Sequence, residues 1–227
     1  AAPMVLNLVL DLCDGNIYLD VQVTYDGVPI LFHDFAPQHY GAKTIGQLDF
    51  QEIVELHNEL TNLVELREIP EPLIFNVELK YPYRDDFELI PFCATQDLQT
   101  YCDPIMNVIT TWNRRMFFSS FCKEVCIYMK NFQKIHPVYF LCDADDIDDS
   151  FEFVTSHHLD GMVCDSRCIF ADESVIKRFK TAGLGLYTYG ALNNDESHMI
   201  RQLELGLSGI ITDCVQKAIK LTERFIP

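Results

Sequence analysis

The stretch that decides the fold spans residues 16–35 and reads NIYLDVQVTYDGVPILFHDF. Polar and apolar side chains alternate up to the pair Asp26 and Gly27, and an apolar run follows. An Asp-Gly pair between two β-rich runs predicts a hairpin. Its two strands carry Asp20 and His33, so we expect a carboxylate and an imidazole to face one pocket.

Downstream of this hairpin, short apolar runs alternate with amphipathic helical segments, a pattern typical of βαβ units and a parallel sheet. Residues 3–12 fit either a buried strand or a clipped helix. We expect strands at 73–80, 116–119, 138–142, 161–164, 184–189 and 209–212. We expect helices at 44–58 with Asp49 as N-cap, and at 60–68, 98–113, 123–133, 148–157, 173–182, 195–206 and 215–224.

With residues 3–12 included there are eight strand candidates, and no G-x-G-x-x-G fingerprint is present. This favours an α/β fold of the TIM (β/α)8 barrel type over a Rossmann sheet, with a β-hairpin near strand 2 and a degenerate first strand. The carboxyl ends of barrel strands carry the site. The candidate site residues there are Asp20, His33, Glu78, Lys80, Ser119, Tyr189 and Asp213.

Composition narrows the function classes. At 227 residues with 48% hydrophobic content, we expect one globular domain over 1–227, excised from a longer protein. The formal charge of −17 argues against nucleic-acid binding and against docking on an anionic membrane. An anionic substrate would need a local cation, such as a divalent metal. The nine scattered cysteines are typical of reduced, packed thiols in an intracellular protein, and no apolar run is long enough to cross a membrane.

Four segments, in chain order, resemble the glycerophosphodiester phosphodiesterase family. Residues 19–35, LDVQVTYDGVPILFHDF, are similar to the family's E-x-D-V-x-x-T-K-D-x-x-P-V-x-x-H-D run. FNVELKYP at 75–82 resembles its N-x-E-x-K strand, and FFSSF at 117–121 resembles its F-S-S-F strand. Residues 185–213 look like the closing strand, helix and strand of the large eukaryotic branch, and the resemblance covers about 6–223.

The resemblance implies a TIM barrel that cleaves glycerophosphodiesters to an alcohol and glycerol 3-phosphate. In such an enzyme three carboxylates hold Mg²⁺ or Ca²⁺, which neutralises charge on the phosphoryl oxygens, and two histidines act as acid and base. Carried over by position, Asp20 and Glu78 match metal ligands and His33 matches one histidine. The matching substrate-pocket positions are Lys80, Ser119, Phe121 and Tyr189.

The departures from the family pattern concern the catalytic groups themselves. The H-R-G motif, which supplies the second histidine and an arginine, occurs nowhere in this sequence, and no E-N-T follows. The first acidic ligand, expected two residues before Asp20, is Tyr18, whose neutral phenol is a poor ligand for a hard cation. A late start of the chain can account for the missing H-R-G, but it cannot account for Tyr18.

Two functional hypotheses follow. The first is a catalytically impaired domain without a cofactor, kept as a regulatory or protein-binding module. It would belong to the fungal branch that joins SPX, ankyrin and phosphodiesterase-like domains and includes a cyclin-dependent-kinase inhibitor of phosphate signalling; residues 193–195 are similar to this branch. We then expect a protein partner, a glycerophosphodiester or phosphate ligand, and a location in cytoplasm or nucleus. The second is an active phosphodiesterase using Mg²⁺ or Ca²⁺, with His39 or Asp34 replacing the missing groups.

Overall fold

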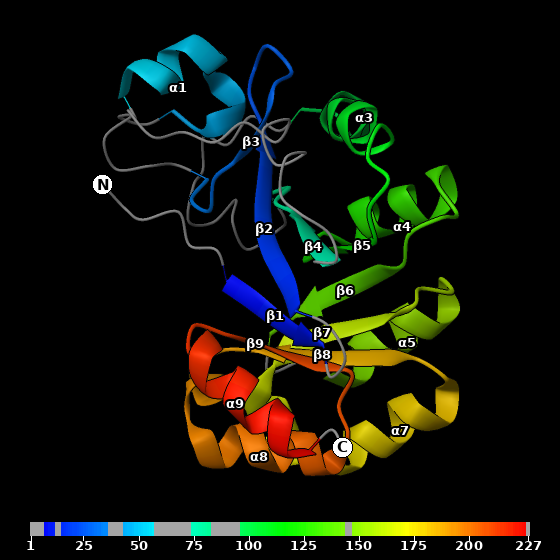
Figure 1. Ribbon diagram of the computed structural model, residues 1–227. Coiled ribbons are helices and arrows are strands. Elements are labelled where there is room, and N and C mark those ends of the chain that lie inside the picture. Colours follow the sequence, from blue (N-terminus) through cyan, green and yellow to red (C-terminus); the bar gives the residue numbers. More distant parts are fainter. Residues whose placement is uncertain are drawn as a thin grey trace.

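The computed structural model of the chain describes residues 7–11, 15–35, 43–56, 74–82, 96–143 and 147–225. In this part of the chain the strands are β1 Asn7–Asp11, β2 Gly15–Val23, β3 Pro29–Leu31, β4 Ile74–Leu79, β5 Met116–Ser120, β6 Val138–Cys142, β7 Gly161–Asp165, β8 Gly185–Tyr189 and β9 Gly209–Thr212. They form one sheet in the order β1-β9-β8-β7-β6-β5-β4-β2-β3, and β1 also pairs with β2. The pairings of the eight strands other than β3 therefore close into a ring, in which β1 lies between β9 and β2 (Figure 1).

Strand direction distinguishes β1 from the rest of the ring. Each pair from β2–β4 through β8–β9 is parallel, as the alternation of strands and helices predicts. In contrast, β1 is antiparallel to both β2 and β9. Of the two alternatives for residues 3–12, the strand is therefore correct for Asn7–Asp11, but it does not run with its neighbours. β3 pairs antiparallel with β2 across the turn at Asp26 and Gly27.

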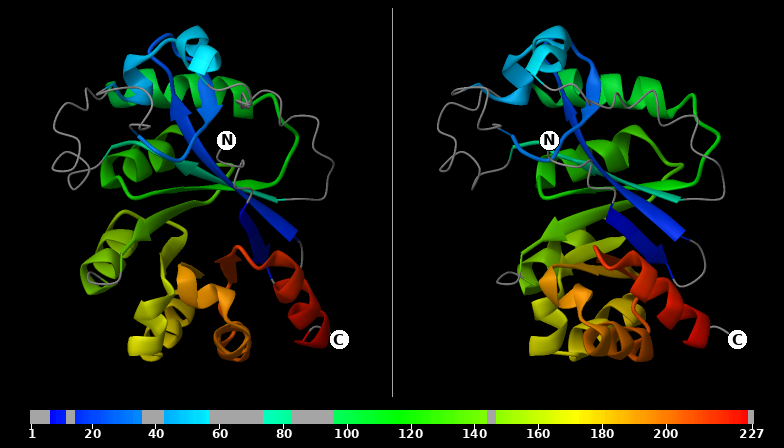
Figure 2. Two further views of the ribbon diagram at one scale, coloured as in Figure 1. Left: turned by 90° about the vertical axis from the view of Figure 1, so that its left-hand side faces the viewer. Right: turned by 60° about the vertical axis from the view of Figure 1, so that its left-hand side comes forward.

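Helices cover the outside of the ring (Figure 2). The described helices are the short 3₁₀ helix η2 Ile45–Gln47, α1 Phe50–Leu56, α3 Leu98–Ile109, α4 Lys123–Phe132, α5 Ile147–Ser156, α6 Ser166–Ala171, α7 Ser174–Ala182, the 3₁₀ helix η4 Ala191–Asn194, α8 Glu196–Leu205 and α9 Val215–Phe225. Their positions agree with the sequence pattern except in three places. The helix predicted over 44–58 is divided into η2 and α1, and neither α6 nor η4 was predicted.

The alternation along each strand separates two layers of core. On β2, Leu19 and Val21 point outward into the layer between sheet and helices, whereas Tyr18 packs in a second cluster. That second cluster takes one buried residue from each of the seven parallel strands: Tyr18, Ile74, Phe117, Leu141, Val163, Tyr187 and Ile211. Seven strands that share one internal cluster enclose a filled barrel interior, not a flat sheet. One end of this interior positions the cavity described below.

The described cysteines agree with the expectation of packed thiols. Seven are free, and all of these are buried except the half-buried Cys214. The predicted helix at 60–68 lies outside the described residues.

Candidate functional site

A cavity of about 420 Å³ opens at the carboxyl ends of the barrel strands. Its walls come from β2, the segment after β3, the end of β4, the residue after β5, β6, β8, η4 and the end of β9. The sequence-predicted residues that line it are Tyr18, Asp20, His33, Glu78, Lys80, Phe121, Tyr189 and Asp213. The fold therefore brings together, at one end of the barrel, residues that are far apart in the sequence.

Two carboxylates and one ammonium form the charged part of this cavity. Asp20 on β2 is in register with Glu78 on β4, and Lys80 follows directly after β4. Lys80 Nζ lies 3.3 Å from Glu78 Oε1 and 3.7 Å from Asp20 Oδ1. The side chains of Lys80, Glu78 and Asp20 are only 10%, 4% and 12% exposed, so water screens these charges poorly. The cation is thus held against both carboxylates.

Asp20 carries the less well satisfied of the two carboxylates. Its Oδ1 is buried and accepts no hydrogen bond from the described residues. Burial raises the pKa of Asp20 above its usual range, and the positive charge of Lys80 offsets only part of that effect. An acceptor in this condition attracts a hydroxyl donor, a proton or a cation.

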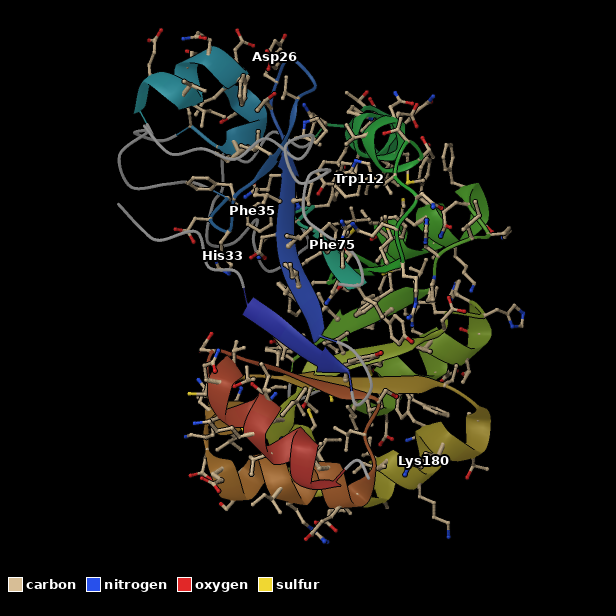
Figure 3. All side chains as sticks on the ribbon, in the orientation of Figure 1. Asp26, His33, Phe35, Phe75, Trp112 and Lys180 are labelled. Atoms are coloured by element: carbon tan, nitrogen blue, oxygen red, sulfur yellow. The ribbon has the colours of Figure 1, made fainter. Side chains whose placement is uncertain are left out.

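His33 lies at the mouth of the cavity. It follows β3, and its Nδ1 is 2.8 Å from Asp34 Oδ1. Figure 3 shows His33 and Phe35 on the same side of β2, and the ring of Phe35 lies 5.6 Å from Lys80 Nζ. The imidazole is 73% exposed, so it remains accessible to a ligand that enters the cavity. Asp34 is therefore a partner that orients His33, and His39 lies outside the described residues.

A match to a family model decides which family this geometry belongs to. The model of the glycerophosphoryl diester phosphodiesterase family matches residues 15–217. This chain belongs to that family. The resemblance that the motifs predict is thereby confirmed at the level of the family.

Curated relatives of this glycerophosphoryl diester phosphodiesterase family member come from plants, fungi and mammals. The chain is 25% identical over 258 residues to glycerophosphodiester phosphodiesterase GDPD2 of Arabidopsis thaliana, covering 92% of this chain and 67% of the relative. It is 26% identical over 283 residues to glycerophosphocholine phosphodiesterase gde1 of Schizosaccharomyces pombe, covering 90% of this chain. It spans only 25% of the length of that fission-yeast protein.

Solved structures show the same barrel. A phosphodiesterase of Oleispira antarctica, in complex with the product sn-glycerol-3-phosphate, superposes with a TM-score of 0.71 at 18% identity, over 91% of this chain and 84% of the other. A glycerophosphodiester phosphodiesterase of Thermotoga maritima superposes with a TM-score of 0.68 at 20% identity, over 90% and 84%. The TIM-barrel fold predicted from the sequence is the fold of these family members. Within the described ranges, no helix combines the length and apolarity that crossing a membrane requires.

Aromatic side chains form a further part of the cavity wall. The rings of Phe121 and Tyr189 meet edge to face with centroids 6.2 Å apart. The Tyr189 hydroxyl donates to Asp143 Oδ1 at 2.8 Å, and burial together with this carboxylate raises the pKa of the phenol far above its usual range. Tyr189 therefore stays neutral and lines the pocket as a fixed surface. Asp143 was not predicted as its partner, because the pairing joins positions 46 residues apart.

Ser119 does not line this cavity as part of the described wall. Its side chain is buried, and its hydroxyl donates to Asn76 Oδ1 at 2.7 Å on the neighbouring strand. This bond ties β5 to β4 next to Glu78, since Ser119 and Glu78 are in register. Its role in this structure is to support the strand that carries Glu78.

Asn194 is a residue of the cavity that sequence reasoning missed. Its Nδ2 donates to Asp213 Oδ2 at 2.9 Å, and its Oδ1 accepts from Thr212 Oγ1 and from the backbone N–H of Asp213. The amide thus fixes the segment after β9 against η4. The neighbouring Asn193 is fully buried and donates to the carbonyl oxygens of Thr188 and Ile211. The resemblance at 193–195 was the available signal, but it did not indicate these bonds.

The donors that the structure describes do not make up a divalent-metal site. Among them, no group of three or more His, Cys, Asp or Glu side chains is arranged to hold an ion. Ca²⁺ binds six or more oxygens, most of them from the protein, whereas Mg²⁺ is held by one or two carboxylates together with water and phosphate oxygens. Here Asp20 and Glu78 share the ammonium of Lys80, and Tyr18 contributes an aromatic ring to the wall. The orphan Oδ1 of Asp20 is the one feature that favours a cation.

Proposed function

We propose that this chain is a catalytically impaired member of its family, which binds a phosphate ester in the barrel cavity and serves as a regulatory or protein-binding module. The observation that supports this most strongly is the position of Lys80, 3.3 and 3.7 Å from the two carboxylates that the resemblance assigns to metal binding. The ammonium supplies the compensating charge there. With Tyr18 in place of the third carboxylate, the site lacks a ligand for the divalent cation that would neutralise the phosphoryl oxygens during hydrolysis.

The missing acid/base groups support the same proposal. No H-R-G motif occurs within residues 1–227, so the second histidine and the arginine that the resemblance implies are not among these residues. We further propose that β1, antiparallel to both neighbours, is a degenerate counterpart of the strand that would carry this motif. Losing one acid/base group removes about 10² to 10⁴ in rate. If the divalent cation is absent in addition to this acid/base group, residual turnover would be very small.

A regulatory role in a longer protein is the finer part of the proposal. The chain matches only 25% of the length of the fission-yeast relative, so in that relative the matching domain is one part of a longer protein. This supports a similar arrangement for the present domain. Membership of the branch with SPX and ankyrin domains, a phosphate-signalling role and a location in cytoplasm or nucleus stay predictions. They are tested by the full-length protein's sequence and by its localisation.

Phosphate-ester binding has a physical basis in the cavity. Lys80 is the one ammonium of the described wall, and His33 at the mouth offers a second donor. The solved structure from Oleispira antarctica, which superposes on this fold, carries sn-glycerol-3-phosphate. We expect the same product to bind here with its phosphoryl group toward Lys80.

The test is an assay of the purified chain with glycerophosphocholine and either Mg²⁺ or Ca²⁺, measuring release of glycerol 3-phosphate. We expect no turnover above that of a buffer control. We also expect calorimetry to detect binding of glycerol 3-phosphate that Lys80→Gln weakens about tenfold. Turnover that His33→Ala abolishes would overturn the proposal.

Turnover that depends on His33 would support the alternative, an active phosphodiesterase with a rearranged site. The orphan carboxylate oxygen of Asp20 favours this alternative, because a cation or a protonated substrate oxygen would satisfy it. His33, accessible at the mouth, would then act as acid or base.

A further inference from the structure

Three cysteines gather where β6, β7 and α6 meet. Cys142 on β6 and Cys164 on β7 are register partners on neighbouring parallel strands. Cys168 comes four residues after Cys164 and lies in α6, which begins directly after β7. All three belong to the buried layer between the sheet and the helices, and all three are thiols in this structure. The fold thus assembles a group of thiols from two strands and a helix.

Cys164 and Cys168 are in direct contact, because their thiols are hydrogen-bonded to each other. This hydrogen bond lowers the pKa of Cys168 from its usual value of 9.0. The same bond, together with burial, raises the pKa of Cys164. Cys168 is therefore the member of the pair that ionises first, and Cys164 keeps its proton. The ionised form is the nucleophilic form of cysteine.

A second group of buried cysteines shows that burial alone has the opposite effect. Cys102 on α3 packs in the same layer as Cys122 and Cys126, which lie around the start of α4. Burial raises the pKa of Cys102 and of Cys122 to about 12, and it also raises the pKa of Cys126. What distinguishes Cys168 is its contact with Cys164.

Solvent access differs within the pair. Cys164 has no exposed surface, whereas Cys168 is 6% exposed and adjoins the exposed Arg167 in α6. Hydroperoxides are small, uncharged oxidants that react with thiolates. Such an oxidant would therefore reach Cys168 before Cys164, and Cys168 is also the more nucleophilic of the two.

The pair lies behind the wall of the family's cavity. The sulfur of Cys168 is 3.9 Å from the backbone carbonyl oxygen of Asp143. The carboxylate of Asp143 accepts from the hydroxyl of Tyr189, which lines the cavity, and the carbonyl oxygen of Cys142 accepts from the same hydroxyl at 3.2 Å. A chemical change at Cys168 is thus made next to a residue that holds the cavity wall.

We propose that Cys168 and Cys164 form a modification site at which a hydroperoxide converts two thiols to a reversible disulfide. Cys168 is the residue attacked by the oxidant, and Cys164 resolves the product. The site is separate from the family's cavity, and its chemistry does not rest on the function proposed above.

The reaction balances with hydrogen peroxide as the oxidant. The Cys168 thiolate attacks one peroxide oxygen and the O–O bond breaks, so that the sulfur loses two electrons and becomes a sulfenic acid. The departing hydroxide takes up a proton and leaves as water. The Cys164 thiol then gives up its proton and attacks the Cys168 sulfur. The S–S bond forms as the S–O bond breaks, and the second hydroxide leaves as water with that proton.

Peptide mapping tests the pair directly, because Arg167 lies between the two cysteines. Trypsin cleaves after Arg167 and separates residues 135–167, which contain Cys142 and Cys164, from residues 168–177, which contain Cys168. The purified chain is treated with hydrogen peroxide, its remaining thiols are alkylated, and it is digested in denaturant. We expect mass spectrometry to find the two peptides joined with the loss of two hydrogens, and separate again after treatment with dithiothreitol.

Four alanine variants separate the steps. Cys164→Ala should prevent the link and leave a sulfenic acid at Cys168 that dimedone labels. Cys168→Ala should give neither the link nor the label. Cys142→Ala should still form the link, because Cys142 is not a member of the pair. Cys122→Ala is the matched control, since it removes a buried thiol of the other group, and it should leave the link unchanged. Thermal melts confirm that each variant folds.

Alkylation of the unsubstituted chain provides a measurement that needs no variant. Iodoacetamide reacts with thiolates, so it should modify Cys168 at least about tenfold faster than Cys102 or Cys122. Equal rates at these cysteines would overturn the proposal. So would a disulfide confined to residues 135–167, which would pair Cys142 with Cys164, and so would a peroxide-treated chain in which the two peptides stay separate. A link that persists in Cys164→Ala would equally refute the assignment.

Discussion

Lys80 Nζ lies 3.3 Å from Glu78 Oε1, where β4 ends at the cavity. The same ammonium is 3.7 Å from Asp20 Oδ1 on the adjacent strand. One lysine therefore balances two nearly buried carboxylates. In such an arrangement each charge depends on the other, because a buried charge without a partner is costly.

Removing this ammonium should destabilise the fold. In Lys80→Met, Glu78 and Asp20 lose their shared cation, although their side chains are only 4% and 12% exposed. We expect the free energy of unfolding at neutral pH to fall by roughly 3 kcal/mol, as when one partner of a buried ion pair is removed. Urea unfolding measures it. The matched control is Lys43→Met, whose partner Glu52 is on the surface, and it should change stability little. Equal losses in both variants would contradict the expectation.

Restoring the missing carboxylate should create cation binding. Tyr18→Glu places a third acid beside Asp20 and Glu78 in the cavity wall. We expect calorimetry to show Ca²⁺ binding in the millimolar range or tighter in this variant, and none in the unsubstituted chain. Tyr25→Glu is the control, because it makes the same charge change on a side chain that is 71% exposed. A similar gain in Tyr25→Glu would show that net charge, and not the cavity, is responsible.

Substitution of two glycines, Gly161 and Gly183, compares the stability lost to a steric clash with the stability lost to backbone strain. A Cβ on Gly161 would lie 2.1 Å from the carbonyl oxygen of Gly185 and 2.6 Å from a ring carbon of Tyr139. Because backbone cannot yield as a side chain can, Gly161→Ala should cost about 3 kcal/mol. Gly183 has φ of 69° and open space around it, so Gly183→Ala should cost only the left-handed strain, about 1 kcal/mol. Chemical denaturation of both variants checks the order, and a larger loss for Gly183→Ala would contradict it.

The start of α8 should be sensitive to acid. The Asp195 carboxylate accepts from the Ser197 hydroxyl and from the backbone N–H groups of His198 and Ser197, and these bonds hold its pKa well below the usual value of 3.8. A lowered folded pKa gives stability that is present above pH 3.8 and lost as pH falls below it. Asp195→Ala should therefore be less stable than the unsubstituted chain at neutral pH, by a margin that narrows in acid.

Asp195→Ser separates the cap from the charge. Serine still accepts the backbone hydrogen bonds but does not titrate, so its margin relative to Asp195→Ala should stay constant with pH. Urea unfolding at neutral and strongly acid pH provides the comparison. If the margin between the unsubstituted chain and Asp195→Ala does not narrow in acid, this electrostatic account is excluded.

Local sequence rules predicted most helices and strands, because the residues that begin or end these elements lie within a few positions of them. The Asp26-Gly27 turn, the capping residues Asp97 and Asp195, and the glycine at 206 all act within a few residues of their own position. The short helix α6 carries such a signal too, since Asp165 caps it by accepting from the Arg167 N–H. It was missed because six residues are too few to show a helical period.

Features set by distant partners could not be predicted in the same way. The direction of β1 depends on pairing with β2 and β9, and its apolar run has no period that indicates direction. The i, i+2 spacing of Glu78 and Lys80 predicted that these two side chains share a face of the strand. The hydrogen bonds from Ser119 to Asn76 and from Asn194 to Asp213 join separate elements, so no local pattern predicts them. Which residues form such hydrogen bonds depends on the closed barrel, because the barrel sets which elements lie next to each other.

The measurement that tests the central claim most directly is a crystal structure grown with Mn²⁺ and glycerol 3-phosphate, using anomalous scattering to locate the metal. We predict phosphoryl oxygens within hydrogen-bond distance of Lys80 and no anomalous peak between Asp20 and Glu78. A manganese ion coordinated by both carboxylates, with Lys80 displaced from them, would contradict it.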